Sequence, residues 1–179
     1  MNSKAATSGF TFIEVAIALV IASLLMTLAL PAFTSFLRDS EIRSSTESLV
    51  NGLRVARSEA VRRNQLVSFT LTGTGGTPSW VVRQVSDNSA IQTYLAQEGG
   101  AHVAVAVQPA GAVSVAFNRL GRVVPVAVGT PTIQQLGVNS TLASNARALQ
   151  IYVDGVHGIR MCDPSPLLAS LVPPDPRAC

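Results

Sequence analysis

The sequence FTFIEVAIALVIASLLMTLALPAFTSFL, residues 10–37, decides the architecture of this 179-residue chain. Its one charged residue is Glu14, and no residue from Val15 to Leu37 carries a charge. At a rise of 1.5 Å per residue, a helix over the uncharged run is about 35 Å long, which is enough to cross the hydrocarbon core of a bilayer. The stretch therefore predicts a membrane-spanning helix.

Glu14 is the unusual residue of this helix. A carboxylate costs up to about 2.5 to 3.5 kcal/mol at the centre of a membrane, so Glu14 is expected to have a partner, and its own helix supplies none. Cleavage after Gly9 would leave a free α-amine on Phe10, which would neutralise Glu14 of a neighbouring subunit when two such helices are staggered. We therefore interpret Glu14 as an assembly residue.

The order of the segments excludes an ordinary secretory signal. In such a signal the small-residue cleavage site follows the apolar run and removes it. Here Gly9 precedes the run, so the helix is expected to stay in the mature protein. An ordinary signal anchor with a stray acidic residue is the alternative.

The junction Ser8-Gly9-Phe10-Thr11-Phe12-Ile13-Glu14-Val15 resembles the class III leader junction of type IV prepilins and type II secretion pseudopilins. Pro31 resembles the helix-bending proline of those families. The resemblance implies a leader over residues 1–9, cleavage after Gly9 by a prepilin peptidase, and N-methylation of Phe10. It also implies a cytoplasmic N-terminus.

Beyond Pro31 the helical pattern becomes amphipathic. Six residues recur at alternating spacings of four and three and so share one face; they are Ile42, Thr46, Leu49, Leu53, Ala56 and Ala60. The opposite face is charged and includes the i, i+4 pair Glu59 and Arg63. We expect one helix from Phe10 to about Arg63, with residues 10–37 in the membrane and residues 38–64 covering a sheet.

Residues 65–179 are predicted to form a single β-rich head. Runs of β-branched and aromatic residues predict antiparallel strands at 66–71, 80–85, 102–107, 113–118, 122–128 and 149–153. Residues 134–147 are ambiguous. The fold class is therefore α+β, with a long N-terminal helix packed on an antiparallel sheet.

The two cysteines, Cys162 and Cys179, bracket a proline-rich C-terminal segment. We predict that they form a disulfide in an oxidising compartment, which stabilises the chain by about 3 kcal/mol. Five prolines between them oppose regular structure, so the covalent link is expected to be the main restraint on this segment. Neither a CxxC motif nor a local His cluster accompanies the pair, so we expect no metal site.

The sequence identifies no catalytic residues and no cofactor site. Asp154 and His157 would supply two parts of a hydrolytic triad, but no nucleophile is evident. The Gly-rich stretch 73–78 lacks the Lys-Ser/Thr pair that a phosphate-binding loop requires. Trp80 lies in a predicted strand and is interpreted as a core anchor rather than a platform for stacked bases.

The pI of about 9.4 raises the question of nucleic-acid binding. Residues 38–63 hold six arginines and four acidic residues, and the chain beyond residue 64 holds six arginines and five acidic residues. No dense basic cluster follows from this order, so we expect a mixed, solvated surface.

The C-terminal pattern YVDGVHGIRMCDP, residues 152–164, resembles the closing segment of the GspH/FimT/FimU minor pilins and H-type pseudopilins, and residues 56–64 and 117–121 resemble two further signatures of that family. The family implies a subunit, not an enzyme, that initiates or caps a type IV pilus or a type II secretion pseudopilus. Its implied partners are other pilins or pseudopilins and an inner-membrane assembly platform. The implied location is the inner membrane, with one pass and a periplasmic head, and then the filament, including its tip.

Some members of this family bind DNA during natural transformation through a Gly-Arg-x-Arg turn before the first cysteine. Aligned on Cys162, this chain has His157-Gly158-Ile159-Arg160, which keeps only the last arginine. One phosphate contact contributes little and is screened by salt. A DNA receptor with Arg160 as a contact is therefore the alternative function, and the C-terminal cysteine pair favours pili over secretion.

Overall fold

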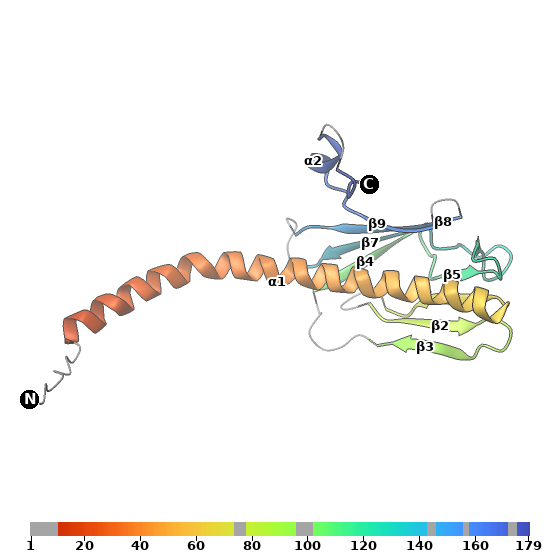
Figure 1. Ribbon diagram of the computed structural model, residues 1–179, viewed down its shortest axis with the longest axis horizontal. Coiled ribbons are helices and arrows are strands. Elements are labelled where there is room, and N and C mark those ends of the chain that lie inside the picture. The colour runs from red at the N-terminus through yellow and green to blue at the C-terminus, as the bar shows by residue number, and fades with distance from the viewer. Residues whose placement is uncertain (1–10, 74–77, 96–101, 143–145, 156–157, 172–174) are drawn as a thin grey trace, which may run out of the picture. The chain divides into compact units, whose positions relative to one another are not determined.

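The computed structural model describes residues 11–73, 78–95, 102–142, 146–155, 158–171 and 175–179 (Figure 1). The chain divides into two compact units, and the second unit begins at Arg38 and runs to Cys179. Gly9 and Phe10 lie outside the described residues. Helix α1 (Phe12–Arg63) contributes its first half to the first unit and its second half to the head.

Helix α1 ends where the sequence predicts. Asn64 adopts a left-handed conformation with φ 54°. The Asn64 N–H donates to the Val61 carbonyl at 3.3 Å, and the Gln65 N–H donates to the Ala60 carbonyl at 3.2 Å. These two bonds form a Schellman motif, which satisfies the last carbonyls of the helix and turns the chain into the sheet.

The head contains two antiparallel sheets with strand orders β3-β2-β1-β5-β6 and β4-β7-β8-β9. The strands of the first sheet are β1 (Val67–Leu71), β2 (Trp80–Gln84), β3 (Ala90–Tyr94), β5 (Ser114–Phe117) and β6 (Val123–Val124). Those of the second are β4 (Val103–Gln108), β7 (Gln135–Ser140), β8 (Leu149–Asp154) and β9 (Gly158–Cys162). A short helix, α2 (Pro166–Ala169), follows in the tail.

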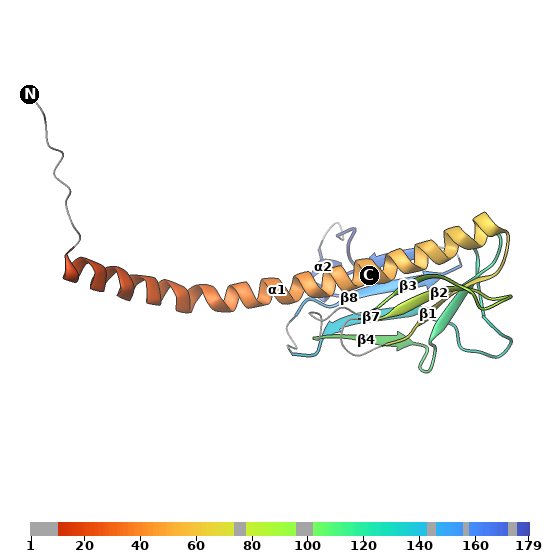
Figure 2. The same cartoon turned by 90° about the horizontal axis from the view of Figure 1, so that it is seen from below.

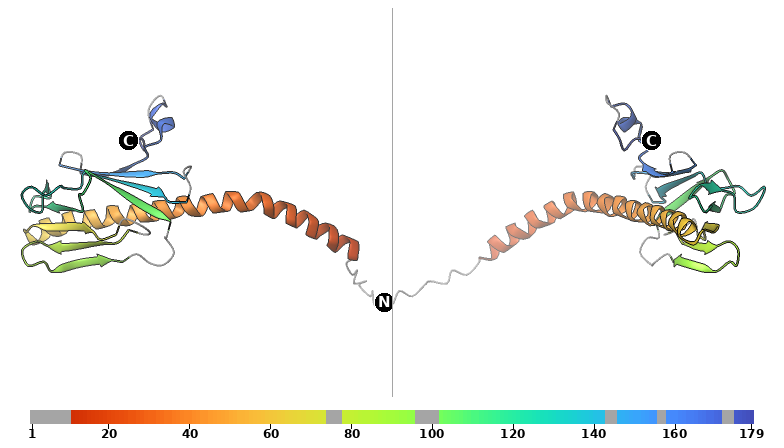
Figure 3. Two further views of the ribbon diagram at one scale, coloured as in Figure 1. Left: turned by 180° about the vertical axis from the view of Figure 1, so that it is seen from behind. Right: turned by 45° about the vertical axis from the view of Figure 1, so that its right-hand side comes forward.

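The second half of α1 packs on both sheets. In Figure 1 the strands of the four-stranded sheet lie above it and β2 and β3 lie below it, and Figure 2 shows strands of both sheets on the same side of the helix. In the oblique view of Figure 3 (right), the second half of α1 runs between the blue strands above it and the yellow-green strands below it. All six residues of the predicted apolar face are buried, the most exposed being Ile42 at 1%. The predicted packing of residues 38–63 on a sheet is confirmed.

The centre of the core is an aromatic group against α1. Trp80 is 1% exposed, and its ring centroid lies 5.5 Å from that of Tyr94 and 5.8 Å from that of Phe69. The Trp80 Nε1–H donates to Ser48 Oγ at 3.1 Å, which satisfies the buried polar atom of the indole. Trp80 is therefore a core residue, as predicted.

Five of the six predicted strands are present with ends shifted by no more than two residues, but the prediction for 122–128 is wrong beyond Val123–Val124. Pro125 has no N–H to continue the ladder, which ends this edge strand. Strands β3 and β9 were not predicted because edge strands with exposed side chains lack a clear alternation. Strand β7 fell in the ambiguous stretch, where Leu136 and Val138 alternate with Gly137.

Candidate functional site

The first half of α1 exposes its apolar side chains. It holds a segment of mean hydropathy 2.5 that is long and apolar enough to cross a membrane, and none of this segment is buried. Phe12 is 90% exposed and Phe36 67%. A helix in the core of a soluble protein would bury this surface, so the exposed apolar side chains are available for lipid or for other helices.

The polar side chains of this segment are satisfied within the helix. The hydroxyls of Ser23, Thr27 and Thr34 each donate to the carbonyl three residues earlier, at 2.8, 2.8 and 3.0 Å. Such back-bonding removes the need for water around a hydroxyl in lipid. The segment is therefore suited to an apolar environment apart from Glu14.

Glu14 lies in the first turn of α1. Its backbone N–H donates to Thr11 Oγ1 at 3.3 Å, so Thr11 caps the helix. Within the described part of the chain, the Glu14 carboxylate has no ion pair or side-chain hydrogen bond. A negative charge in the first turn interacts favourably with the helix dipole. In an apolar medium, however, the charge still needs a counter-charge.

The C-terminal lobe, residues 163–179, is closed by the disulfide between Cys162 and Cys179. The predicted pairing is thus present, and backbone hydrogen bonds that were not expected act beside the covalent link. The Asp163 N–H donates to the Arg177 carbonyl at 2.7 Å, and the Cys179 N–H donates to the Asp163 carbonyl at 3.1 Å. Pro166 begins α2, a position where no backbone N–H is required, so this proline permits the helix that it was expected to oppose.

A buried carboxylate ties the lobe to the sheet. Asp163 is 3% exposed and forms an ion pair with Nε of Arg147, while the Arg147 backbone N–H donates to Asp39 Oδ1 at 3.3 Å. Arg147 therefore links the lobe, the chain before β8 and the start of the second half of α1. The sequence alone did not indicate this network, because the three residues are far apart in the chain.

Arginine side chains lower the pKa values of Glu59 and Asp175. The side-chain hydrogen bonds from Arg62 and Arg63 lower the pKa of Glu59 from 4.5 to about 2. The side-chain hydrogen bond from Arg177 lowers the pKa of Asp175 from 3.8 to about 2. The predicted i, i+4 pair of Glu59 and Arg63 is present at 2.7 Å. Both groups are structural salt bridges and identify no reactive centre.

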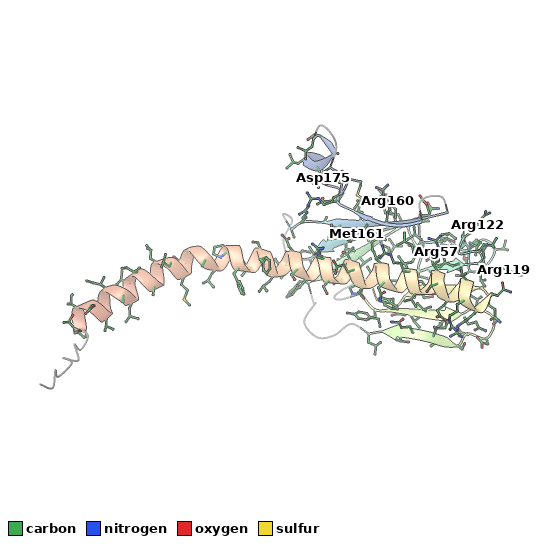
Figure 4. The ribbon with its side chains drawn as sticks, viewed as in Figure 1. Arg57, Arg119, Arg122, Arg160, Met161 and Asp175 are labelled. Atoms are coloured by element: carbon green, nitrogen blue, oxygen red, sulfur yellow. A yellow bond between two sulfur atoms is a disulfide. The ribbon has the colours of Figure 1, made fainter. Side chains whose placement is uncertain are left out.

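Arg160 lies on β9 (Figure 4), where it pairs in register with Tyr152 of β8. Ile151 and Val153 of β8 are buried against the core, so by the pleat Tyr152 and Arg160 face the opposite, outer side of the sheet. His157 lies outside the described residues, and Asp154 Oδ1 accepts the Gly158 N–H at 3.1 Å as part of the hairpin.

The fold brings two other arginines together. A cleft of about 250 Å³ is lined by Arg57 of α1, by Leu120 and Arg122 of the β5–β6 turn, and by Asp154 and Ile159 of the β8–β9 hairpin (Figure 4). We call it the arginine cleft. The sequence alone did not indicate this cleft, because Arg57 and Arg122 are 65 residues apart (122 − 57) and no local basic run contains both.

The comparisons with known proteins decide the family. The family model of type II transport protein GspH matches residues 45–156, which is more than half of the chain. The chain belongs to the GspH family. A second model, the prokaryotic N-terminal methylation motif, matches residues 4–30. No curated protein matches the chain.

Solved structures agree with this family in fold. The GspH-family chain is similar to the type IV minor pilin FimU of Pseudomonas aeruginosa, with 17% identity and a TM-score of 0.52 over 66% of this chain and 90% of FimU. A second crystal form of FimU gives 19% identity and 0.52 over 68% and 88%. The minor pseudopilin EpsH of the Vibrio cholerae type 2 secretion system has 13% identity and 0.49 over 70% and 98%. The likeness to FimU supports the fold, and nothing in the comparisons favours DNA binding.

Proposed function

We propose that this GspH-family chain is a minor subunit that initiates or caps a type IV pilus or a type II secretion pseudopilus. The observation that carries the proposal is the division of α1: its first half exposes an apolar surface with one acidic residue, while its second half is packed into the head. An exposed apolar helix is held by lipid before assembly and by neighbouring helices afterwards.

Processing is the first step of the proposed cycle. A prepilin peptidase removes the leader, residues 1–9, by cleavage after Gly9 and methylates Phe10. The match of the N-terminal methylation motif to residues 4–30 supports this step. The chain is its substrate rather than an enzyme itself.

Assembly follows from the chemistry of Glu14. Residues 10–37 hold the subunit in the inner membrane, residues 38–64 connect them to the sheets, and residues 65–179 form the periplasmic head. The new α-amine of one subunit neutralises Glu14 of another on the assembly platform, where other pilins or pseudopilins join. This pairing removes an unpaired charge from an apolar environment and so favours the filament.

The test has two measurements on the protein from its native cells. Intact mass should show a chain that begins at N-methylated Phe10, and sheared filaments should contain it at low copy number relative to the major subunit. A mature chain that retains Met1 to Gly9, or one cut after Leu37, contradicts the proposal. Neighbouring genes for a secretin and a secretion ATPase would assign it to secretion rather than to pili.

A further inference from the structure

The arginine cleft contains two cations that form no ion pair among the residues that the structure describes. Within the described ranges, no ion pair joins Arg57 or Arg122 to a carboxylate. Both residues are exposed at the rim of the cleft. A guanidinium group presents planar N–H donors that suit a carboxylate or a phosphate. The site is therefore open to an anion from outside the molecule.

The backbone around Arg57 is shaped to admit its side chain. A Cβ on Gly121 would lie 3.1 Å from Arg57 Nε, and a Cβ on Gly158 would lie 3.2 Å from Arg57 Nη1. The two glycines, in the β5–β6 turn and in the β8–β9 hairpin, have φ values of 71° and 77°. The two glycines thus leave room for the Arg57 side chain beside both turns, while the residue stays exposed.

The remaining surroundings favour a carboxylate on a protein over nucleic acid. Leu120 and Ile159 line the cleft, whose exposed surface is otherwise mostly polar. A second cleft of about 460 Å³, with Val61 in its mostly apolar lining, shares Arg57 and Ile159 with it. Asp154 also lies in the lining, where its Oδ1 accepts the Gly158 N–H and belongs to the hairpin.

Two further exposed arginines lie near the cleft: Arg54 lines the second cleft together with Arg57, and Arg119 belongs to the β5–β6 turn. Arg62 lines the second cleft but is already bonded to Glu59 at 2.6 Å. Arg160 faces the outer side of the four-stranded sheet. A nucleic-acid surface needs a row of cations along the backbone of the ligand, so duplex DNA is the competing ligand that the test below has to exclude.

We propose that the arginine cleft binds an acidic side chain of a neighbouring subunit, with Arg57 and Arg122 on its carboxylate and with Leu120 and Ile159 against the flanking apolar residues. This contact rests on the proposed function, because the partner is a subunit of the same filament. It would fix the orientation of the head, whereas Glu14 acts in the apolar half of the helix.

The direct test uses the full chain in detergent micelles and a hexaglutamate peptide as the probe. Arg57→Gln and Arg122→Gln should each weaken peptide binding by about tenfold, as expected for loss of a charge-assisted hydrogen bond. Arg160→Gln is the matched control, since it removes the same charge from an exposed arginine on the other face, and it should retain wild-type affinity. Thermal unfolding of each variant checks that it is folded.

Each contrary result overturns the inference in its own way. Absence of hexaglutamate binding to the wild type, or equal loss in Arg57→Gln and Arg160→Gln, excludes a specific carboxylate site. If Arg57→Gln weakens the binding of a 20-base-pair DNA duplex as much as it weakens the binding of the peptide, the cleft binds nucleic acid instead.

A test in filament-producing cells separates this inference from the proposed function. A photo-crosslinker at Leu120, which is 68% exposed, should capture another filament subunit next to an Asp or Glu, and Arg57→Gln should abolish the adduct. If the wild-type chain is absent from sheared filaments, the proposed function fails and the inference fails with it. If the chain is present and the adduct survives Arg57→Gln, the inference alone fails.

Discussion

Gly52 of α1 and Trp80 of β2 are so close that a Cβ on Gly52 would lie 2.9 Å from the indole ring, and it would also lie 2.8 Å from Phe69 Cε2. No real Cβ tolerates such contacts without movement of its neighbours. Glycine at this position therefore sets how closely the helix approaches the first sheet, and the aromatic core depends on that approach.

Gly52→Ala should destabilise the head by about 1 to 2 kcal/mol. Overpacking typically costs about 1 to 3 kcal/mol, and contacts below 3.0 Å with two aromatic rings place this site in the upper part of that range, above the gain of about 1 kcal/mol in helix propensity. Urea unfolding followed by the fluorescence of Trp80, the one tryptophan of the chain, measures the change. Gly137→Ala is the control, because a Cβ there meets Ala106 at an ordinary 3.9 Å. Equal stability of the two variants would contradict the argument.

Glu14→Ala should leave processing intact and lower recovery of the chain in sheared filaments. The carboxylate has no partner among the described residues, so its counter-charge is expected from another subunit. Glu14→Gln keeps the size of the side chain and should show the same defect, which separates charge from shape. Recovery at the wild-type level with either variant would show that Glu14 is not the assembly contact.

Cys179→Ser should make the C-terminal lobe more sensitive to protease while the sheets stay folded. The hydrogen bonds between Asp163 and the chain end, and its ion pair with Arg147, should still hold the lobe in part. Adding Arg147→Ala should open it further, by about 1 to 3 kcal/mol, because Asp163 is then buried without its cation. Limited proteolysis with intact mass measures both steps. If the single variant is cleaved as fast as the double variant, the disulfide is the main restraint after all.

The Glu59 salt bridges should stabilise the head only while the carboxylate is ionised. Hydrogen bonds from Arg62 and Arg63 lower the pKa of Glu59 in the folded state from 4.5 to about 2. The contribution of these salt bridges to the free energy of unfolding is therefore complete above about pH 5 and is lost as the pH falls from 4.5 to 2. Glu59→Gln should therefore lower the free energy of unfolding by about 1 kcal/mol at pH 7, and the difference should vanish near pH 2.

The pH test has an internal control. Glu47→Gln removes an exposed pair with Arg43, whose side chain is 73% exposed, and should change stability by less than about 0.5 kcal/mol at either pH. A pH-independent effect of Glu59→Gln would mean that Glu59 stabilises the head through the packing of its side chain and not through its charge.

Duplex DNA should bind the full chain weakly and dissociate between about 50 and 200 mM salt, since Arg160 faces the outer side of the sheet without a row of other cations. Arg160→Gln should change this binding little. Electrophoretic mobility shifts over a salt series measure it. Tight binding that survives 200 mM salt and depends on Arg160 would make the DNA receptor the leading function.

Local patterns in the sequence were sufficient for much of the architecture. The uncharged run ending at Leu37, the apolar face with Leu49 and Leu53, and the end of α1 at Arg63 depend on residues within a few turns of one another. Helix periodicity and charge placement report directly on such short-range relations, so the apolar half and the packed half of α1 were predictable. The cysteine pair was predictable because the chain offers no other partner.

The tertiary structure decided what depends on distant residues. Edge strand β9, the burial of Asp163 beside Arg147, and the approach of Gly52 to Trp80 leave no periodic trace in the sequence. The arginine cleft is the clearest case, since Arg57 and Arg122 are brought together only when the helix and the β5–β6 turn pack on the same hairpin. The sequence by itself determined a helix with one apolar half and one amphipathic half. Which charges meet on the head was decided by the pairing of strands, because contacts across a sheet are set by register and not by order along the chain.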